Sequence, residues 1–149
     1  MKPMIAVAAT LLPVVWSCQP AHRPQPMPPR TAVAVSASFD RTWQAALDAF
    51  KDQNVEALTE RYSGTIRGTV ELMSGDQGGQ DCGVSNDGKA IRPQLAGYRI
   101  TIKGDSTAST VIASATYLSA PGIAVQECGS RGTWESQFEM DVKGRAERR

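Results

Sequence analysis

The chain has 149 residues, and its 16 lysines and arginines nearly balance its 15 aspartates and glutamates. A chain of this length forms one small domain, and its 41% hydrophobic and 21% charged residues are typical of an ordinary globular protein. The balanced charge gives no electrostatic reason to expect a nucleic acid or an anionic surface as partner, so we predict no nucleic-acid binding.

Residues 1–17 have the composition of a secretory signal peptide. Lys2 precedes an apolar run over residues 4–16, which only Thr10 interrupts. About a dozen apolar residues are too few for a transmembrane helix, which needs about 20, and they fit the apolar core of a signal peptide. Pro13 lies near the end of the run, where it would break a helix and leave the cleavage site extended.

The residues before Cys18 resemble the lipobox of bacterial lipoproteins. In a lipobox, an aliphatic residue and two small residues precede the cysteine that becomes the lipidated N-terminus. Val15, Ser17 and Cys18 match this pattern, and Trp16 is bulkier than the usual residue. The resemblance implies acylation of Cys18, and several acyl chains would anchor the protein permanently in a membrane.

The residue after Cys18 bears on which membrane holds the anchor. Among such lipoproteins of Gram-negative bacteria, a residue other than Asp at this position goes with sorting to the outer membrane. Gln19 therefore implies a place in the cell envelope, at the outer membrane and facing the periplasm. The alternatives are cleavage near Ser17 without acylation, which gives a soluble secreted protein, and a buried N-terminal strand.

Residues 18–30 are predicted to be the lipidated cysteine followed by a proline-rich tether. Proline recurs at positions 20, 24, 26, 28 and 29, and such a segment forms a semi-rigid polyproline-II-like spacer of about 3 Å per residue. His22 is the only histidine of the chain and has no Cys, His or acidic cluster beside it. We therefore expect it to be a solvent-exposed spacer residue and not a metal ligand.

The single domain over residues 31–149 begins with a predicted strand and helix. Residues 31–37 alternate small and β-branched side chains, as in a short strand. Ser38 is a good N-cap, with Asp40 in the first turn of a helix that ends near residue 53. One apolar stripe at helical spacing consists of Phe39, Trp43, Ala46, Leu47 and Phe50. Packing of this stripe against a sheet is favoured over contact with a ligand.

Residues 55–62 and 65–73 are predicted to form a hairpin around a two-residue turn at Ser63 and Gly64. In the second strand, apolar or small residues face one way: Ile66, Gly68, Val70 and Leu72. Polar residues face the other way: Thr65, Arg67, Thr69 and Glu71. One buried and one solvated face indicate an antiparallel sheet.

The next region is a long predicted loop followed by further strands. Residues 74–97 are rich in Gly, Asp and Asn. The spacing of the aspartates in this segment does not match the calcium-binding loop of an EF-hand. We therefore predict a solvated loop without a metal site. Residues 98–102 and 107–117 alternate as two more antiparallel strands, and 123–128 fit a short strand or an extended lead-in.

The C-terminal segment fits two periods. Alternate residues would share one face of a strand: Trp134, Ser136, Phe138, Met140 and Val142. Residues at every fourth position would share one face of a helix: Trp134, Phe138, Val142 and Ala146. Thr133 suits a helix cap, and the acidic residues near the start and basic residues near the end of the segment match the charge preference of the helix dipole. Gly144 counts against a helix, because glycine lowers helix stability. We predict a helix.

Three cysteines become an even pair if Cys18 carries the lipid. An exported chain folds in an oxidising compartment, so we predict a disulfide between Cys82 and Cys128. Because the bridge lowers the conformational entropy of the unfolded chain, it would stabilise the folded state by about 4 kcal/mol. A metal site or a catalytic thiol is disfavoured, because the domain contains no histidine and no C-x-x-C motif.

An ordered set of short motifs resembles the landmarks of a family of small, uncharacterised bacterial lipoproteins. These motifs are residues 38–43, 63–66, 81–83, 127–128 and 132–135. The layout is also similar to the helix-grip domains of the accessory lipoprotein of the outer-membrane barrel-assembly machine. From the elements we predict an α+β domain, in which an antiparallel sheet of about five strands carries two helices on one face.

The function favoured by these features is that of a membrane-anchored envelope lipoprotein that binds a protein partner without catalysis or a cofactor. Assembly of the envelope is one role of this kind. The expected contact residues are Arg67, Thr69 and Glu71, on the helix-free sheet face; an ordinary solvated strand is the alternative for them.

A second hypothesis is a small-ligand carrier with an apolar cavity between helices and sheet. Its lining would be Trp43, Phe50, Trp134 and Phe138, whose alternative role is the core. An enzyme is disfavoured because no histidine in the domain can serve as a base, although Ser/Lys and paired-carboxylate schemes stay open.

Overall fold

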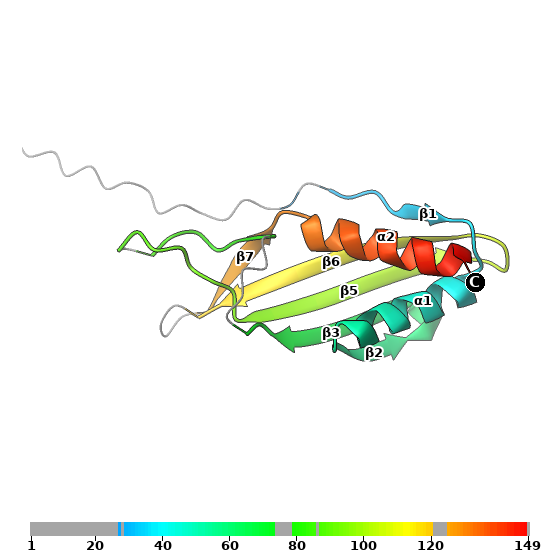
Figure 1. Cartoon of the computed structure of the whole chain (residues 1–149), viewed down its shortest axis with the longest axis horizontal. Coiled ribbons are helices and arrows are strands. Elements are labelled where there is room, and N and C mark those ends of the chain that lie inside the picture. Colours follow the sequence, from blue (N-terminus) through cyan, green and yellow to red (C-terminus); the bar gives the residue numbers. More distant parts are fainter. Residues whose placement is uncertain (1–26, 28, 74–78, 86, 121–124, 149) are drawn as a thin grey trace, which may run out of the picture.

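Two helices lie side by side on one face of an antiparallel sheet in the computed structural model (Figure 1). The structure describes residues 27, 29–73, 79–85, 87–120 and 125–148. In chain order the elements are β1 (Val33–Val35), α1 (Phe39–Asp52), β2 (Glu56–Glu60), the 3-10 turn η1 (Arg61–Ser63), β3 (Thr65–Glu71), β4 (Gln80–Asp81), β5 (Leu95–Gly104), β6 (Ser109–Ser119), β7 (Gln126–Ser130) and α2 (Thr133–Arg148). The predicted α+β class and its two-helix layer are confirmed.

The sheet has seven strands where the sequence predicted about five. Its order is β2-β3-β5-β6-β7-β4, and β1 pairs with the remaining part of the β6 edge. The difference arises mainly at one end, where β4 has only two residues and pairs with β7. A two-residue strand inside a Gly- and Asp-rich segment has no alternation that a sequence pattern can detect.

Helix α1 forms as its sequence predicts. The Ser38 side chain accepts a hydrogen bond from the backbone N–H of Arg41 at 3.4 Å, which caps the helix. Trp43, Ala46 and Phe50 are buried, and Leu47 packs at the margin of the core. The stripe therefore faces the sheet and not solvent.

The β2–β3 connection differs from the predicted two-residue turn. Strand β2 ends at Glu60, and η1 with Gly64 makes the connection, because Gly64 adopts a left-handed φ of 66°. A Cβ at this position would lie 2.1 Å from the carbonyl oxygen of Ile102. Glycine is required here by both the backbone conformation and the close approach of β5.

Strands β3, β5 and β6 alternate between two faces, and their inward residues form the core with both helices. Ile66, Ile100 and Val111 are fully buried. The helical prediction for the C-terminal segment is confirmed, since Phe138 and Val142 of α2 are buried against this sheet. The two helices are also joined by an ion pair between Arg145 of α2 and Asp52, the last residue of α1, at 2.6 Å.

The predicted disulfide between Cys82 and Cys128 is present, and both residues are buried. Cys82 follows β4 directly and Cys128 lies in β7, so the bridge and the β4–β7 pairing hold the same two segments together. This explains how a two-residue strand is retained at the edge of the sheet.

Two buried glutamates of α2 complete the β6 edge. Strand β1 pairs with β6 up to Val111, and β7 begins to pair at Tyr117. Between them, the backbone N–H of Ala113 donates to Glu139 Oε1 at 2.8 Å, and that of Ala115 donates to Glu135 Oε1 at 3.2 Å. Side-chain carboxylates thus satisfy the donors that lack a strand partner.

The last residues assigned to the tether contact the domain. Arg30 forms an ion pair with Glu139 and donates from Nη1 to the carbonyl oxygen of Gly132 and to Ser136 Oγ, both at 3.1 Å. The chain is therefore attached to α2 before β1 begins. Among the described helices, none is long and apolar enough to cross a membrane.

Candidate binding site on the outer sheet face

The face of the sheet opposite α1 and α2, here called the outer face, brings polar side chains of three neighbouring strands together. The register places Arg67 of β3 opposite Arg99 of β5, and Arg99 opposite Ser114 of β6. In the next row, Thr69 lies opposite Gly97, which in turn lies opposite Thr116 of β6.

These two rows surround a hollow of about 440 Å³. It is lined by Arg67, Gly68, Thr69, Gly97, Tyr98, Arg99, Ser114 and Thr116. Because Gly97 stands between Thr69 and Thr116 and has no side chain, the surface is depressed at this point. A Cβ at Gly97 would meet nothing closer than the Thr116 carbonyl oxygen at 3.9 Å. The hollow therefore combines hydroxyl groups with two guanidinium groups.

The charges in the hollow are unevenly compensated. Arg67 is half exposed and lies 3.4 Å from the Glu60 carboxylate on β2. Arg99 is exposed and makes no ion pair with any residue that the structure describes. Like charges directly opposite each other on neighbouring strands destabilise a sheet. Arg99 is thus an unpaired cation among the described residues. The nearest rows of the same face also carry carboxylates, those of Glu56 on β2 and of Glu71 at the end of β3.

A second hollow of about 300 Å³ adjoins the first and shares Arg99 and Ser114 with it. Its remaining lining consists of Met27, Pro29, Arg30, Thr101, Ile112 and Ala113. The two hollows extend across β5 and β6 to the point where the tether joins the domain. The site is therefore elongated.

The three predicted contact residues do not share one hollow. Arg67 and Thr69 lie together in the first, whereas Glu71 lines a separate hollow of about 420 Å³ with Leu72, Met73, Gln94 and Leu95. Cys18, the predicted lipidation site, lies outside the described residues, as does His22.

Sequence reasoning missed the residues that β5 and β6 contribute. The alternation of these strands places Arg99, Ser114 and Thr116 on the polar side, which is a detectable signal. Which of these residues face Arg67 depends on strand pairing, and pairing is not visible in the period of either strand.

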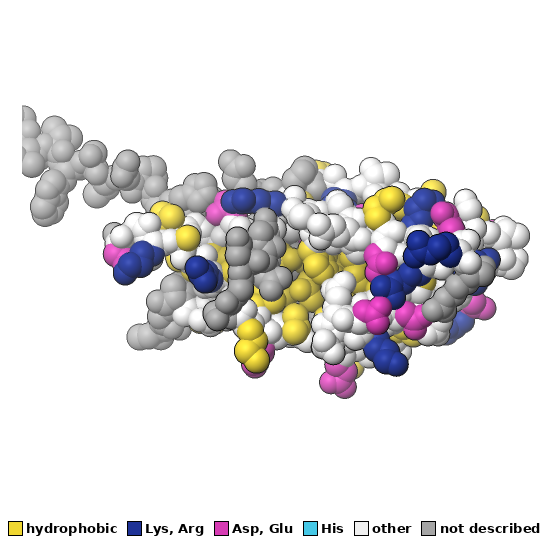
Figure 2. Space-filling view, in the orientation of Figure 1, with side chains coloured by type: hydrophobic (Ala, Val, Ile, Leu, Met, Phe, Trp, Pro, Cys, Tyr) yellow, Lys and Arg dark blue, Asp and Glu magenta, His cyan; other side chains and the backbone are white. Residues whose placement is uncertain are grey.

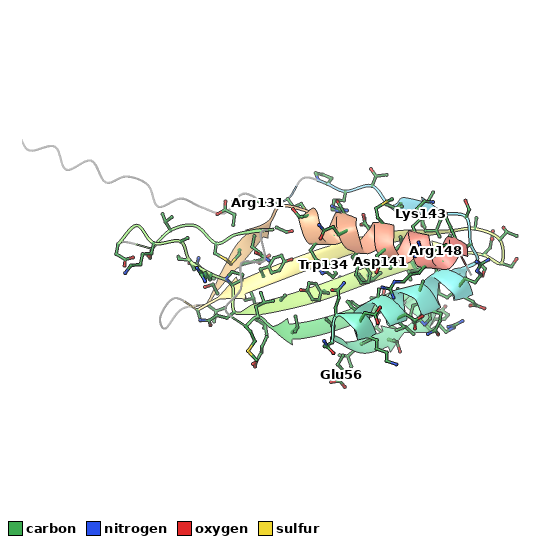
Figure 3. All side chains as sticks on the ribbon, viewed as in Figure 1. Glu56, Arg131, Trp134, Asp141, Lys143 and Arg148 are labelled. Carbon is green, nitrogen blue, oxygen red and sulfur yellow. A yellow bond between two sulfur atoms is a disulfide. The ribbon has the colours of Figure 1, made fainter. Side chains whose placement is uncertain are left out.

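The four rings proposed to line a carrier cavity instead contact other rings. Phe138 lies between Phe50, at a centroid distance of 5.2 Å, and Trp134, at 4.9 Å. Trp43 stacks on Phe39 at 5.6 Å. Figure 3 labels Trp134 at the start of α2, where Nε1 donates to Gln53 Oε1 at 3.0 Å. Phe50, Phe138 and Trp134 thus pack together where α1 and α2 meet. Trp43 lies instead beside Arg61 of the β2–β3 connection, with its ring centroid 5.7 Å from the guanidinium carbon.

The helix side of the molecule carries a different kind of surface. Hydrophobic side chains gather in the middle of this side, and charged side chains gather toward the C-terminal end of α2 (Figure 2). Partly buried residues that pack against the core include Val70, Leu72 and Trp134. Nothing in the described residues shows what covers this apolar area.

The pKa values of two buried tyrosines are raised. Burial, and next the nearby Glu135 carboxylate, raises the pKa of Tyr98. Burial also raises the pKa of Tyr117, with smaller contributions from Tyr98 and Glu135. In the segments that the structure describes, no three His, Cys, Asp or Glu residues are placed to hold a metal ion.

Comparison with protein-family models gives no match for this sequence, and comparison with curated proteins gives none either.

Proposed function

We propose that the protein is a lipid-anchored lipoprotein of the bacterial outer membrane, which binds a protein partner through its outer face without catalysing a reaction. The observation that carries the proposal is the elongated site on this face, where Arg67, Arg99 and Thr69 stand on an open sheet. An open face with an arginine that has no ion-pair partner among the described residues, and with hydroxyl groups beside it, offers contacts that a core-forming face does not.

The anchor part of the proposal rests on residues 1–30. The lipobox-like residues that end at Cys18 supply the anchor, and the proline-rich segment supplies a spacer. The junction between spacer and domain supports a link with the site, because Met27, Pro29 and Arg30 line its second hollow. A partner bound there would lie beside the point where the chain leaves toward the membrane.

Site-directed photo-crosslinking in the native cells tests the partner. A photoreactive amino acid replaces Thr69, in the first hollow, and in a control strain replaces Met140, which is exposed on α2. We expect a discrete crosslinked envelope protein from position 69 and not from position 140. If position 69 gives no discrete product, or if both positions give the same products, the proposed binding role is wrong.

The intact mass of protein extracted from membranes tests the anchor. Cleavage before Cys18, the added acyl chains and the two hydrogens lost in the Cys82–Cys128 bridge each change this mass. We expect all three changes in the native protein, and release from the membrane fraction by Cys18→Ser. An unmodified Cys18 would contradict lipid anchoring and leave the fold unaffected.

A further inference from the structure

We infer that the outer face binds an extended peptide segment that carries carboxylates, with Arg99 as its central contact. This inference rests on the proposed function, because it names the chemistry of the partner at the same site. It follows from three features of the described residues: the charge of the site, its length, and the missing side chain at Gly97.

The charge of the site calls for an acidic ligand. Arg67 and Arg99 are directly opposite in the β3–β5 register. Of the two, Arg67 forms an ion pair, with Glu60 at 3.4 Å, and Arg99 forms none with the described residues. A ligand carboxylate placed between the two guanidinium groups would relieve their repulsion. It would also accept charge-assisted hydrogen bonds, which are about twice as strong as neutral ones.

The length and lining of the site favour a peptide chain over a single small anion. The first hollow offers the hydroxyl groups of Thr69, Ser114 and Thr116, which can donate to and accept from peptide groups. The second hollow continues past Arg99 and adds apolar side chains, among them Ile112 and Met27. An extended segment with alternating acidic and small apolar side chains matches this sequence of contacts.

Gly97 has no structural reason to be glycine. Its φ lies outside the left-handed region, and a Cβ there would lie no closer than 3.9 Å to another heavy atom. Glycine inside a strand lowers stability and often marks a place where another chain approaches closely. A side chain at this position would fill the floor of the first hollow, so the glycine keeps the site open.

Fluorescence anisotropy of the full chain in nonionic detergent tests the inference. The probe is a fluorescent peptide of alternating Asp and Ala, and the comparison peptide has Asn in place of every Asp. We expect saturable binding of the Asp peptide and at least about tenfold weaker binding of the Asn peptide. Each replacement of Asp by Asn removes a carboxylate that would accept charge-assisted hydrogen bonds from a guanidinium group. Equal affinity for both peptides would overturn the role of charge.

Two variants and a matched control locate the site. Arg99→Gln should weaken binding of the Asp peptide by about tenfold or more. Lys103→Gln, which removes an exposed charge of the same strand outside both hollows, should change it by less than about twofold. Gly97→Val should also abolish tight binding, without lowering the unfolding temperature. Unchanged binding by either Arg99→Gln or Gly97→Val would contradict the assigned site.

Three further outcomes separate this inference from the proposed function. If uronic-acid oligomers bind at Arg99 and the Asp peptide does not, the ligand is an acidic polysaccharide and the inference of a peptide is wrong. If no probe binds while position 69 still crosslinks to an envelope protein, the acidic chemistry is wrong and the proposed function stands. If position 69 crosslinks to nothing, the proposed function itself fails.

Discussion

The substitution Glu139→Gln tests whether the buried carboxylate on α2 stabilises the fold through its charge. Glu139 is almost completely buried, and its two oxygens have different partners: Oε1 accepts from the Ala113 N–H at 2.8 Å, and Oε2 pairs with Arg30. Glutamine has nearly the same shape and keeps one acceptor. Its amide group would face the Arg30 guanidinium, donor against donor.

The expected loss is worked from these contacts. Removing one partner of a buried ion pair costs about 3–5 kcal/mol. Arg30 keeps its hydrogen bonds to Gly132 and Ser136, and its side chain is 17% exposed, so part of its charge stays solvated. We therefore expect Glu139→Gln to lower the free energy of unfolding by about 1.5–3 kcal/mol, the range for a hydrogen bond to a charged group.

The assay is urea unfolding followed by tryptophan fluorescence, with Glu60→Gln as the matched control. Glu60 forms an exposed ion pair with Arg67, and such pairs contribute about 0–1 kcal/mol. A double-mutant cycle with Arg30→Gln should give a coupling energy of at least about 1 kcal/mol. If Glu139→Gln costs no more than Glu60→Gln, the carboxylate does not act through its buried charge, and our reasoning is refuted.

Three other perturbations have defined outcomes. Gly64→Ala should lower the free energy of unfolding, measured by urea titration, by at least about 2 kcal/mol, because the left-handed backbone strains an alanine and its Cβ clashes with β5. Gly88→Ala is the control: Gly88 is also left-handed but lies in open space, so this substitution should lower the free energy of unfolding by less. The double variant Cys82→Ala/Cys128→Ala opens a loop of 46 residues and should lower the free energy of unfolding in urea by about 4 kcal/mol. A decrease of less than about 1 kcal/mol would contradict stabilisation of the fold by the disulfide. Backbone N–H groups of the β5–β6 turn lower the pKa of Asp105 to about 2 from 3.8. Its contribution is complete above pH 3.8 and is lost as the pH falls through about 2, so Asp105→Asn should flatten the unfolding temperature in this range.

The helices and the central strands were predictable because their patterns are local. The apolar stripe of α1 and the cap at Ser38 are read within a few turns of one helix. The alternation of β3 is read within one strand, and it placed Arg67 and Thr69 on the solvated side. For α2 the helical period was the correct choice, because Phe138 and Val142 face the core.

The strand count and one turn were not predictable at this level. Strand β4 exists because β7 and the Cys82–Cys128 bridge hold it, and not because of its own two residues. The β2–β3 turn is set by contact between Gly64 and Ile102, whose backbone N–H donates to the Gly64 carbonyl at 2.8 Å. Both features depend on parts of the chain that are distant in sequence.

The candidate site shows the same division. The sequence by itself determined which residues are polar and outward on each strand, and its balanced total charge gave no sign of a local positive site. Only the tertiary structure placed Arg99 opposite Arg67 and joined two hollows along β5 and β6. The register of strands far apart in the chain follows from burial of their other face, which no single strand encodes.

The buried glutamates are the clearest case. In the sequence Glu135 and Glu139 indicated only the N-terminal half of a helix, where negative charge is favourable. In the structure they accept hydrogen bonds from the part of the β6 edge that neither β1 nor β7 covers. A carboxylate's role there depends on which backbone donors the rest of the fold leaves unpaired, and that is decided by the assembled sheet.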